Sequence, residues 1–188
     1  YFRNFGRTRR QGVETGARAQ AGRVTFGAGY TWLQATFQSE ETVNGESNGS
    51  NDKAEEGEPG LEGVIEIEAG DRLPFIPSHM LKVYGDVRVT AKVNVDVNMI
   101  STGSSFARGN ENNRHEPDGT YYLGEGAVAR YAIVNLNARY ALTNRVQILG
   151  QVNNLFDRPY ATGAQLAPAG FTADGIFVAR PLPAIGGE

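Results

Sequence analysis

The sequence predicts an all-β fold of antiparallel strands, and it favours a transmembrane β-barrel. Three observations support this prediction. Segments of about ten residues alternate apolar and polar side chains, which is the two-residue period of a strand with two different environments. Short turns and long polar loops alternate between these segments, so all short turns fall at one end of the strands. A soluble antiparallel sheet shows the same alternation, so alternation alone does not distinguish the two folds. The length of the strands, the third observation, and the asymmetry of the loops both favour the barrel.

Composition limits the other possibilities. The chain has 188 residues, of which 40% are hydrophobic, and no apolar run approaches the roughly 18 residues of a membrane-spanning helix. A barrel strand needs an apolar residue only at every second position, so this composition is compatible with a membrane barrel. The absence of cysteine excludes disulfides and thiolate chemistry. The net charge of −3 argues against nucleic-acid binding.

The first predicted strand pair covers residues 8–21 and 24–37. In the first strand Val13 alternates with Glu14, and in the second Val24, Phe26, Ala28, Tyr30 and Trp32 share one face. A tight turn near residues 21–23 joins them. Two aromatics at the far end of the second strand are compatible with the interfacial girdle of a barrel or with the core of a soluble sandwich.

A long loop is then predicted over residues 38–78, followed by a second strand pair. Between Glu40 and Asp71 lie 11 of the 21 acidic residues with a single lysine, so this block is expected to be solvated. The chain re-enters a strand at His79, turns near residues 91–93, and continues as a strand over residues 93–100. A second exposed loop is expected over residues 106–126.

The third strand pair has the clearest alternation. It covers residues 131–142 and 146–153, with a turn at Thr143-Asn144. A third long loop over residues 157–173 and a weaker strand over residues 175–180 complete the prediction. In a barrel, one face of these strands would line a water-filled lumen. The residues predicted to face the lumen and to contact a ligand are Glu14, Arg18, Lys82, Asp86, Arg88, Asp96, Asn137, Arg139 and Asn153.

The sequence contains few residues that are suited to catalysis. Only two histidines occur, His79 and His115, and the adjacent Ser78 and His79 would point to opposite faces of a strand. No catalytic residue, metal site or cofactor is therefore predicted. The acidic block contains no spacing that matches a twelve-residue calcium loop.

Three motifs resemble TonB-dependent outer-membrane receptors. The string Asn153-Asn154-Leu155-Phe156-Asp157-Arg158-Pro159-Tyr160 is similar to the "N-L-F-D-x-x-Y" pattern of the penultimate strand in that family. Residues 4–14 resemble its "N-x-G-x-x-R-x-x-G-V-E" passage, which includes Gly12 and Glu14. Residues 73–79 resemble its "P-x-x-P-x-H" strand entry, which includes Pro77 and His79. The motifs occur in the family's order and cover nearly the whole chain.

The resemblance implies a barrel of about 22 strands with a plugged lumen. It implies import of a scarce nutrient, such as a ferric siderophore, with energy from the inner-membrane TonB complex. Residues 1–188 would be the C-terminal portion of that barrel, holding about seven strands, and we expect truncation at both ends. The partners implied are the plug domain, TonB, outer-membrane lipid or lipopolysaccharide, and a metal chelate as ligand.

The motif residues are expected to be structural. Phe156 and Tyr160 are predicted to be interfacial aromatics, and strand parity places Asn153 on the lumen side but Asn154 and Phe156 on the lipid side. The other residues assigned a structural role by the motifs are Gly12, Pro77, His79, Leu155 and Asp157. Two alternatives stay open: a small self-contained outer-membrane barrel with a structural or adhesion role, and a soluble β-sandwich that binds a ligand or partner.

Overall fold

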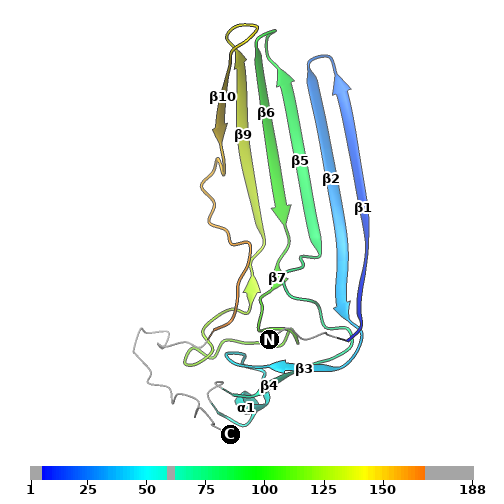
Figure 1. Cartoon of the computed structure of the whole chain (residues 1–188), viewed down its shortest axis with the longest axis vertical. Helices are drawn as coiled ribbons and strands as arrows, with labels where there is room; N and C mark the ends of the chain where they lie inside the picture. Colours follow the sequence, from blue (N-terminus) through cyan, green and yellow to red (C-terminus); the bar gives the residue numbers. More distant parts are fainter. Residues whose placement is uncertain (1–5, 59–61, 168–188) are drawn as a thin grey trace.

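The computed structural model describes residues 6–58 and 62–167. Its main feature is one six-stranded antiparallel sheet, in the order β1-β2-β5-β6-β9-β10 (Figure 1). The strands are β1 (Thr8–Ala21), β2 (Val24–Phe37), β5 (His79–Arg88), β6 (Val93–Thr102), β9 (Tyr131–Ala141) and β10 (Gln147–Val152). Within the described ranges, no helix has the length and hydropathy needed to cross a membrane. The all-β antiparallel fold is therefore confirmed, whereas the strand predicted over residues 175–180 lies outside the described residues.

Smaller elements lie in the long connections. β3 (Glu41–Asn44), α1 (Asp52–Glu55) and β4 (Val64–Ile67) lie between β2 and β5, and β3 pairs with β4. β7 (Ser105–Phe106) pairs with β8 (Ala127–Val128) between β6 and β9. We call these two connections, residues 38–78 and 103–130, the loop layer. The alternation of the sequence predicted the long strands but not these short elements.

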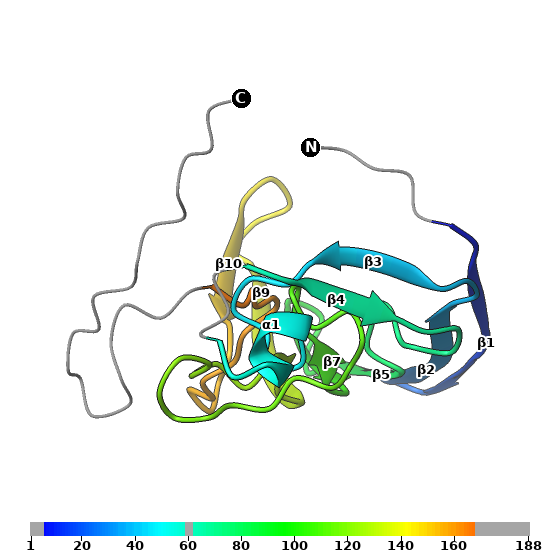
Figure 2. The same cartoon turned by 90° about the horizontal axis from the view of Figure 1, so that it is seen from below.

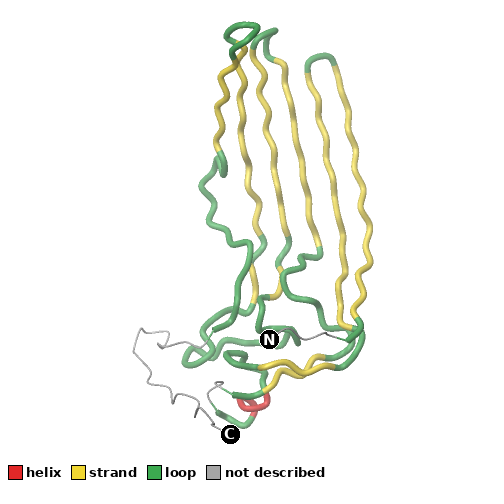
Figure 3. The backbone as a smooth tube through the Cα atoms, viewed as in Figure 1, coloured by secondary structure: helices red, strands yellow, loops and turns green. Residues whose placement is uncertain are grey.

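Tight turns join the strands in pairs at the end opposite the loop layer (Figures 1 and 3). Gly22 has a φ of 57°, a left-handed conformation that glycine adopts without strain, between β1 and β2. The Thr90 hydroxyl accepts hydrogen bonds from the N–H groups of Lys92 and Val93 between β5 and β6. The Thr143 hydroxyl accepts from Arg145 and Val146 in the same way between β9 and β10. Short turns thus occupy one end of the sheet and long loops the other, as predicted.

The strand register divides the sheet into an apolar face and a polar face. Phe26 lies opposite Ala19 and Gly85, Gly85 opposite Val97, and Val97 opposite Leu136, so one row of the apolar face crosses five strands. These side chains are uncovered: Phe26 is 52% exposed and Val97 40% exposed. Figure 2 shows the sheet as a single layer. Among the described residues no second sheet covers the apolar face, so the soluble sandwich is not the observed architecture.

The buried core lies in the loop layer instead. Ile65 and Ile67 of β4 are fully buried, and Phe37 at the end of β2 joins them. The other buried apolar residues of the described chain are Ala35, Ala107, Tyr122, Val128 and Leu166. The acidic side chains of residues 40–71 are exposed or half-buried, as expected of a solvated block. The prediction of simple exposed loops is nevertheless incomplete, because these loops also bury several polar side chains.

The Asn154-Leu155-Phe156-Asp157 motif forms a turn instead of continuing a strand. β10 ends at Val152, and both Asn154 (φ 50°) and Asp157 (φ 48°) have left-handed backbones, which asparagine and aspartate tolerate better than most residues. The Asn154 side chain accepts a hydrogen bond from Arg158 N–H at 3.0 Å and donates one to its carbonyl at 2.9 Å. The prediction that Asn154 and Phe156 follow strand parity is therefore wrong.

Candidate functional site

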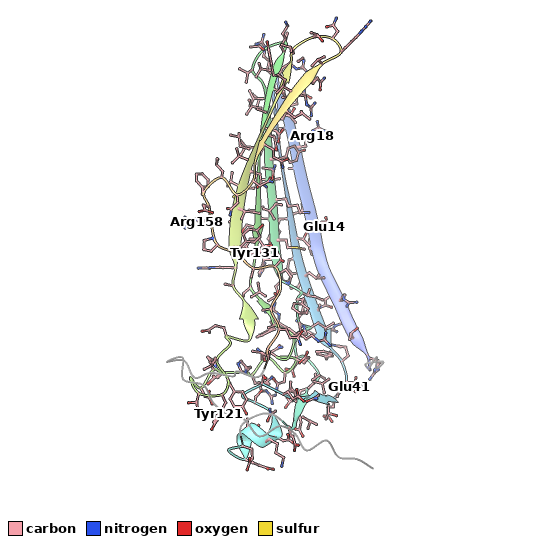
Figure 4. The ribbon with its side chains drawn as sticks, turned by 60° about the vertical axis from the view of Figure 1, so that its left-hand side comes forward. Glu14, Arg18, Glu41, Tyr121, Tyr131 and Arg158 are labelled. Atoms are coloured by element: carbon pink, nitrogen blue, oxygen red, sulfur yellow. The ribbon has the colours of Figure 1, made fainter. Side chains whose placement is uncertain are left out.

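The polar face gathers the residues that were predicted to face a lumen. Rows of paired residues cross the sheet, so side chains distant in the sequence become neighbours. One row runs from Asp86 through Asp96 to Asn137, and the next from Arg88 through Asn94 to Arg139. Glu14 and Arg18 lie on this face of β1 (Figure 4), and the register of β5 against β2 places Lys82 on the same face of the sheet.

Asparagine side chains donate hydrogen bonds to the two carboxylates of this face. Asp86 and Asp96 lie directly opposite each other on neighbouring strands, a placement of like charges that costs stability. Asn94 donates a hydrogen bond to Asp86, and Asn137 donates one of 2.6 Å to Asp96. Arg88 and Arg139 in the adjacent row bring positive charge nearby. The carboxylates are thereby kept as fixed acceptors on the face.

A second polar row fixes the end of β10 to the sheet. Asn135 donates to the Asn98 side-chain oxygen at 2.9 Å, and its own oxygen accepts from Asn154 N–H at 2.9 Å. Leu155 N–H also bonds the Val134 carbonyl at 2.7 Å. The motif turn is therefore anchored to β9 through a polar-face asparagine. Strand parity alone could have identified Asn98 and Asn135, which were not among the predicted site residues.

The cations of the polar face are open to solvent. Arg18, Lys82, Arg88 and Arg139 are exposed, and none forms an ion pair with another described residue. Asn153 lies on the same side, because its side-chain oxygen accepts a 2.7 Å hydrogen bond from Gln151. The predicted site residues thus share one face but do not converge on a single pocket. Such a face can offer charges and amides to a partner or solute passing along it.

An aromatic ring covers one glycine of this face. Gly27 lies opposite Tyr84, and a Cβ atom built on Gly27 would come 2.4 Å from the Tyr84 ring. The Tyr84 side chain therefore occupies the space above Gly27, whose partner on the other side is Arg18. The sequence shows both residues in alternating segments but gives no sign of this contact.

The other motif residues lie within a strand, at a strand start or in the segment after β10. Gly12 is on β1, and a Cβ atom there would be 2.1 Å from the Trp32 carbonyl oxygen, so the close approach of β1 to β2 requires glycine. His79 begins β5, as predicted, and Pro77 is half-buried just before it. Phe156 and Tyr160 are exposed, and the Tyr160 ring lies 4.9 Å from that of Tyr131.

Asparagines and a histidine join the two connections of the loop layer. Asn48 donates to the Gly109 carbonyl, and Asn48 is fully buried. His115 accepts from Gly49 N–H on Nδ1 at 2.7 Å, so Nε2 carries the proton that is donated to the Gly124 carbonyl at 2.7 Å. The bonds of Asn48 and Gly49 connect residues 61 and 66 positions apart, and together with the bond from His115 to Gly124 they order a region predicted only as exposed loop.

Asp118 organises the outer part of the second connection. Burial alone would raise the pKa of its carboxyl, but hydrogen bonds from the N–H groups of Tyr122, Thr120 and Tyr121 outweigh it and lower the pKa below 3.8. No group of three or more histidine, acidic or cysteine side chains in the described part of the chain could hold a metal ion. The geometry therefore offers a charged surface and an ordered loop layer.

Comparison with known proteins shows which protein family and which solved structures the chain resembles. The family model described as "TonB dependent receptor-like, beta-barrel" matches residues 1–155. The siderophore receptor PiuA from Acinetobacter baumannii is similar in structure, with a TM-score of 0.62 and 16% identity over 89% of this chain and 20% of that one. No curated protein matches the sequence.

Two further solved structures agree with this likeness. The ferric-catecholate import receptor Fiu from E. coli K12 has a TM-score of 0.53 at 16% identity, covering 90% of this chain and 19% of its own. The copper transporter OprC has a TM-score of 0.51 at 18% identity, covering 93% and 21%. The chain thus spans about a fifth of the length of each of these structures.

Proposed function

Because the chain belongs to the TonB-dependent receptor β-barrel family, we propose that it forms part of the wall of an outer-membrane receptor that imports a scarce nutrient. A ferric siderophore is the ligand class we favour, with energy supplied by TonB. Two of the similar structures are a siderophore receptor and a ferric-catecholate import receptor, which supports this class. Transport, and not catalysis, is the activity proposed.

One observation carries the proposal: a single-layer sheet has a large uncovered apolar face and an opposite polar face. In water the apolar face would be costly, since each square ångström of exposed apolar surface costs about 25 cal/mol. In a bilayer, lipid hydrocarbon contacts the apolar face, and the polar face lines the water-filled lumen. Short turns at one end and an ordered loop layer at the other fit the periplasmic and external sides of such a barrel.

The polar face would then contact the plug domain and the passing ligand. Asp86, Asp96, Arg88 and Arg139 lie toward the turn end of the sheet, where they would contact a plug inside the barrel. Glu14 lies nearer the loop layer, where ligand would enter. The ligand contacts of the loop layer would come from its exposed side chains, because its asparagines are occupied by hydrogen bonds within the layer.

The closing strands of the barrel are the second element of the proposal. β1 and β10 are the two edges of the described sheet, and each would leave unpaired backbone groups in lipid at a cost of several kcal/mol apiece. In the proposed receptor these edges pair with further strands of a barrel of about 22. The alternative of a small adhesion barrel instead requires a parent chain of about 20 kDa, the mass of this segment.

Uptake by the full-length receptor tests the function. Cells that carry or lack the receptor would be given a ferric catecholate labelled with radioactive iron, with and without functional TonB. We expect accumulation only when both are present. Replacing Arg88 and Arg139 together by glutamine should reduce uptake, whereas Arg145→Gln at a turn should not. Receptor-independent accumulation, or accumulation unaffected by TonB, would contradict the proposal.

A further inference from the structure

The first connection of the loop layer contains two Asn-Gly pairs, Asn44-Gly45 and Asn48-Gly49. In such a pair the glycine nitrogen can reach the side-chain amide of the preceding asparagine, because glycine has no side chain to obstruct the approach. Asn44 is exposed, and Gly45 N–H donates to the Gly63 carbonyl at 2.9 Å. Asn48 is fully buried, and Gly49 N–H donates to an imidazole. The two pairs thus have the same covalent structure in different surroundings.

The imidazole is that of His115, and its Nδ1 is placed to act as a base. It lies 2.7 Å from the Gly49 nitrogen, within the reach of about 2.6–3.2 Å that a general base requires. Because Gly49 N–H donates to it, Nδ1 is the unprotonated nitrogen of the ring. The Nε2–H group donates to the Gly124 carbonyl at 2.7 Å, which fixes the tautomer and the orientation of the ring. The Tyr122 ring meets the imidazole edge-on, with centroids 6.2 Å apart.

Two donors polarise the side-chain amide of Asn48. Its Oδ1 accepts hydrogen bonds from Ser50 N–H and from the Ser50 hydroxyl, both at 2.8 Å. Asn112 Nδ2 donates to the same hydroxyl at 2.9 Å, so the hydroxyl proton is directed to Asn48. Donors about 2.7–3.1 Å from an oxygen stabilise the negative charge that it gains in a tetrahedral intermediate. The two Ser50 donors are therefore placed as an oxyanion hole for attack at Asn48 Cγ.

The surroundings keep glycine at position 49. A Cβ atom built on Gly49 would lie 2.6 Å from the Glu116 carbonyl oxygen, so a larger residue would require a shift of the chain. Asn48 Nδ2 donates to the Gly109 carbonyl, which holds the side-chain amide in one orientation. Base, nucleophile and amide thus share one fixed arrangement, and groups held in this way react faster than groups that move freely.

We propose that Asn48 and Gly49 react with each other to form a succinimide, with His115 as the general base. The Gly49 nitrogen forms a bond to Asn48 Cγ while its proton passes to His115 Nδ1. The Ser50 donors stabilise the oxygen that becomes negative. The imidazolium then returns the proton to the side-chain nitrogen, the Cγ–Nδ2 bond breaks, and ammonia leaves. Water opens the ring to aspartate or isoaspartate. This modification site goes beyond the proposed function and does not depend on it.

The reaction would remove a link between the two connections of the loop layer. Asn48 Nδ2 donates to the Gly109 carbonyl, but the carboxylate that replaces the amide has no proton to donate. A buried carboxylate that faces a carbonyl oxygen is unfavourable. Isoaspartate also moves the main chain through the former side chain. The modification would therefore loosen the loop layer irreversibly.

Peptide mass spectrometry of the full-length receptor tests the site. The folded receptor in lipid vesicles would be incubated at neutral pH in heavy-oxygen water, which labels each succinimide as it opens. We expect Asn48 to be converted at least about tenfold faster than Asn44, because a positioned general base accelerates a reaction by about a hundredfold or more. Burial without catalysis protects an asparagine, so slower or equal conversion of Asn48 in the folded receptor would overturn the proposal.

Variants separate base catalysis from an effect of the local sequence. His115→Gln keeps groups that can accept from Gly49 and donate to Gly124 but removes the base, so it should slow conversion of Asn48 about tenfold or more and leave Asn44 unchanged. His79→Gln, which removes the other histidine, should change neither rate. Unchanged or faster conversion of Asn48 in His115→Gln would overturn the role of the imidazole.

The unfolded receptor supplies a second control. In guanidinium the contacts of the loop layer are lost, so the two Asn-Gly pairs should react at similar rates. Ser50→Ala in the folded receptor removes one oxyanion donor and should slow Asn48 in the same direction as His115→Gln. A preference for Asn48 that persists in the unfolded chain would assign the difference to the neighbouring sequence and would overturn the site.

Discussion

Placing a charge at the centre of the apolar face should destabilise the barrel strongly. Val97 is midway along the outward residues of β6, which run from Val93, opposite Tyr140, to Ser101, opposite Leu81. These eight residue steps span about 26 Å along the strand, so Val97 lies about 13 Å from either end. Arginine at the bilayer midplane costs about 2–4 kcal/mol in outer-membrane barrels. We expect Val97→Arg to lower the free energy of unfolding by that amount.

A matched change on the polar face supplies the control. Leu149 is 72% exposed and lies opposite Arg139, so Leu149→Arg places an arginine in water beside a like charge and should cost at most about 1 kcal/mol. Both variants of the full-length receptor would be unfolded with guanidinium in lipid vesicles, and the folded fraction followed by gel mobility. Equal costs for the two variants would refute the assignment of the apolar face to lipid.

Three further predictions follow from single contacts. Gly12→Ala would bring a Cβ atom to 2.1 Å from the Trp32 carbonyl and should cost about 1–3 kcal/mol in denaturant unfolding; no loss would mean that β1 and β2 can separate there. Asn154→Ala removes both hydrogen bonds to Arg158 and should cost about 1–2 kcal/mol, with Asn154→Gly as the variant that keeps the left-handed backbone; an equal cost for both would assign the loss to the side-chain bonds. The Asp118 carboxyl has a lowered pKa in the folded chain, so its bonds to residues 120–122 stabilise the loop above about pH 3.8 and are lost as the pH falls through the lowered pKa. Hydrogen exchange at these three amides, corrected for its intrinsic pH dependence, should therefore become faster only in acid. In Asp118→Ala it should be fast already at neutral pH.

Alternation predicted the long strands well because burial against one solvent fixes side-chain parity. β1 and β2 occupy the predicted residues 8–21 and 24–37. The polar-face residues followed from the same parity, because an antiparallel register carries parity from strand to strand. Which of them touch was not predictable: the bond from Asn137 to Asp96 depends on a register between strands 41 residues apart.

The loop layer and the motif turn were not predicted, because contacts without a two-residue period hold them. The loop layer is held by side-chain bonds to backbone groups, such as Asn51 to the Gly45 carbonyl, and such bonds follow no two-residue period. The motif turn failed the parity rule because Asn154 and Asp157 leave the extended conformation. An asparagine or aspartate after a strand signals a turn as readily as a continuation, so strand parity does not hold from Asn154 onward.

The proposed function requires one face of the sheet to meet lipid and the other to meet water. The chain contains no cysteine, so single cysteines can be placed along β6 in a full-length receptor made free of other cysteines. A membrane-impermeant maleimide would then be applied to the receptor in lipid vesicles. We predict labelling at Asn94, Asp96 and Asn98, and protection at Val95 and Val97. Labelling that does not alternate, or that marks the valines and spares the polar positions, would contradict the assignment of the apolar face to lipid and the polar face to water.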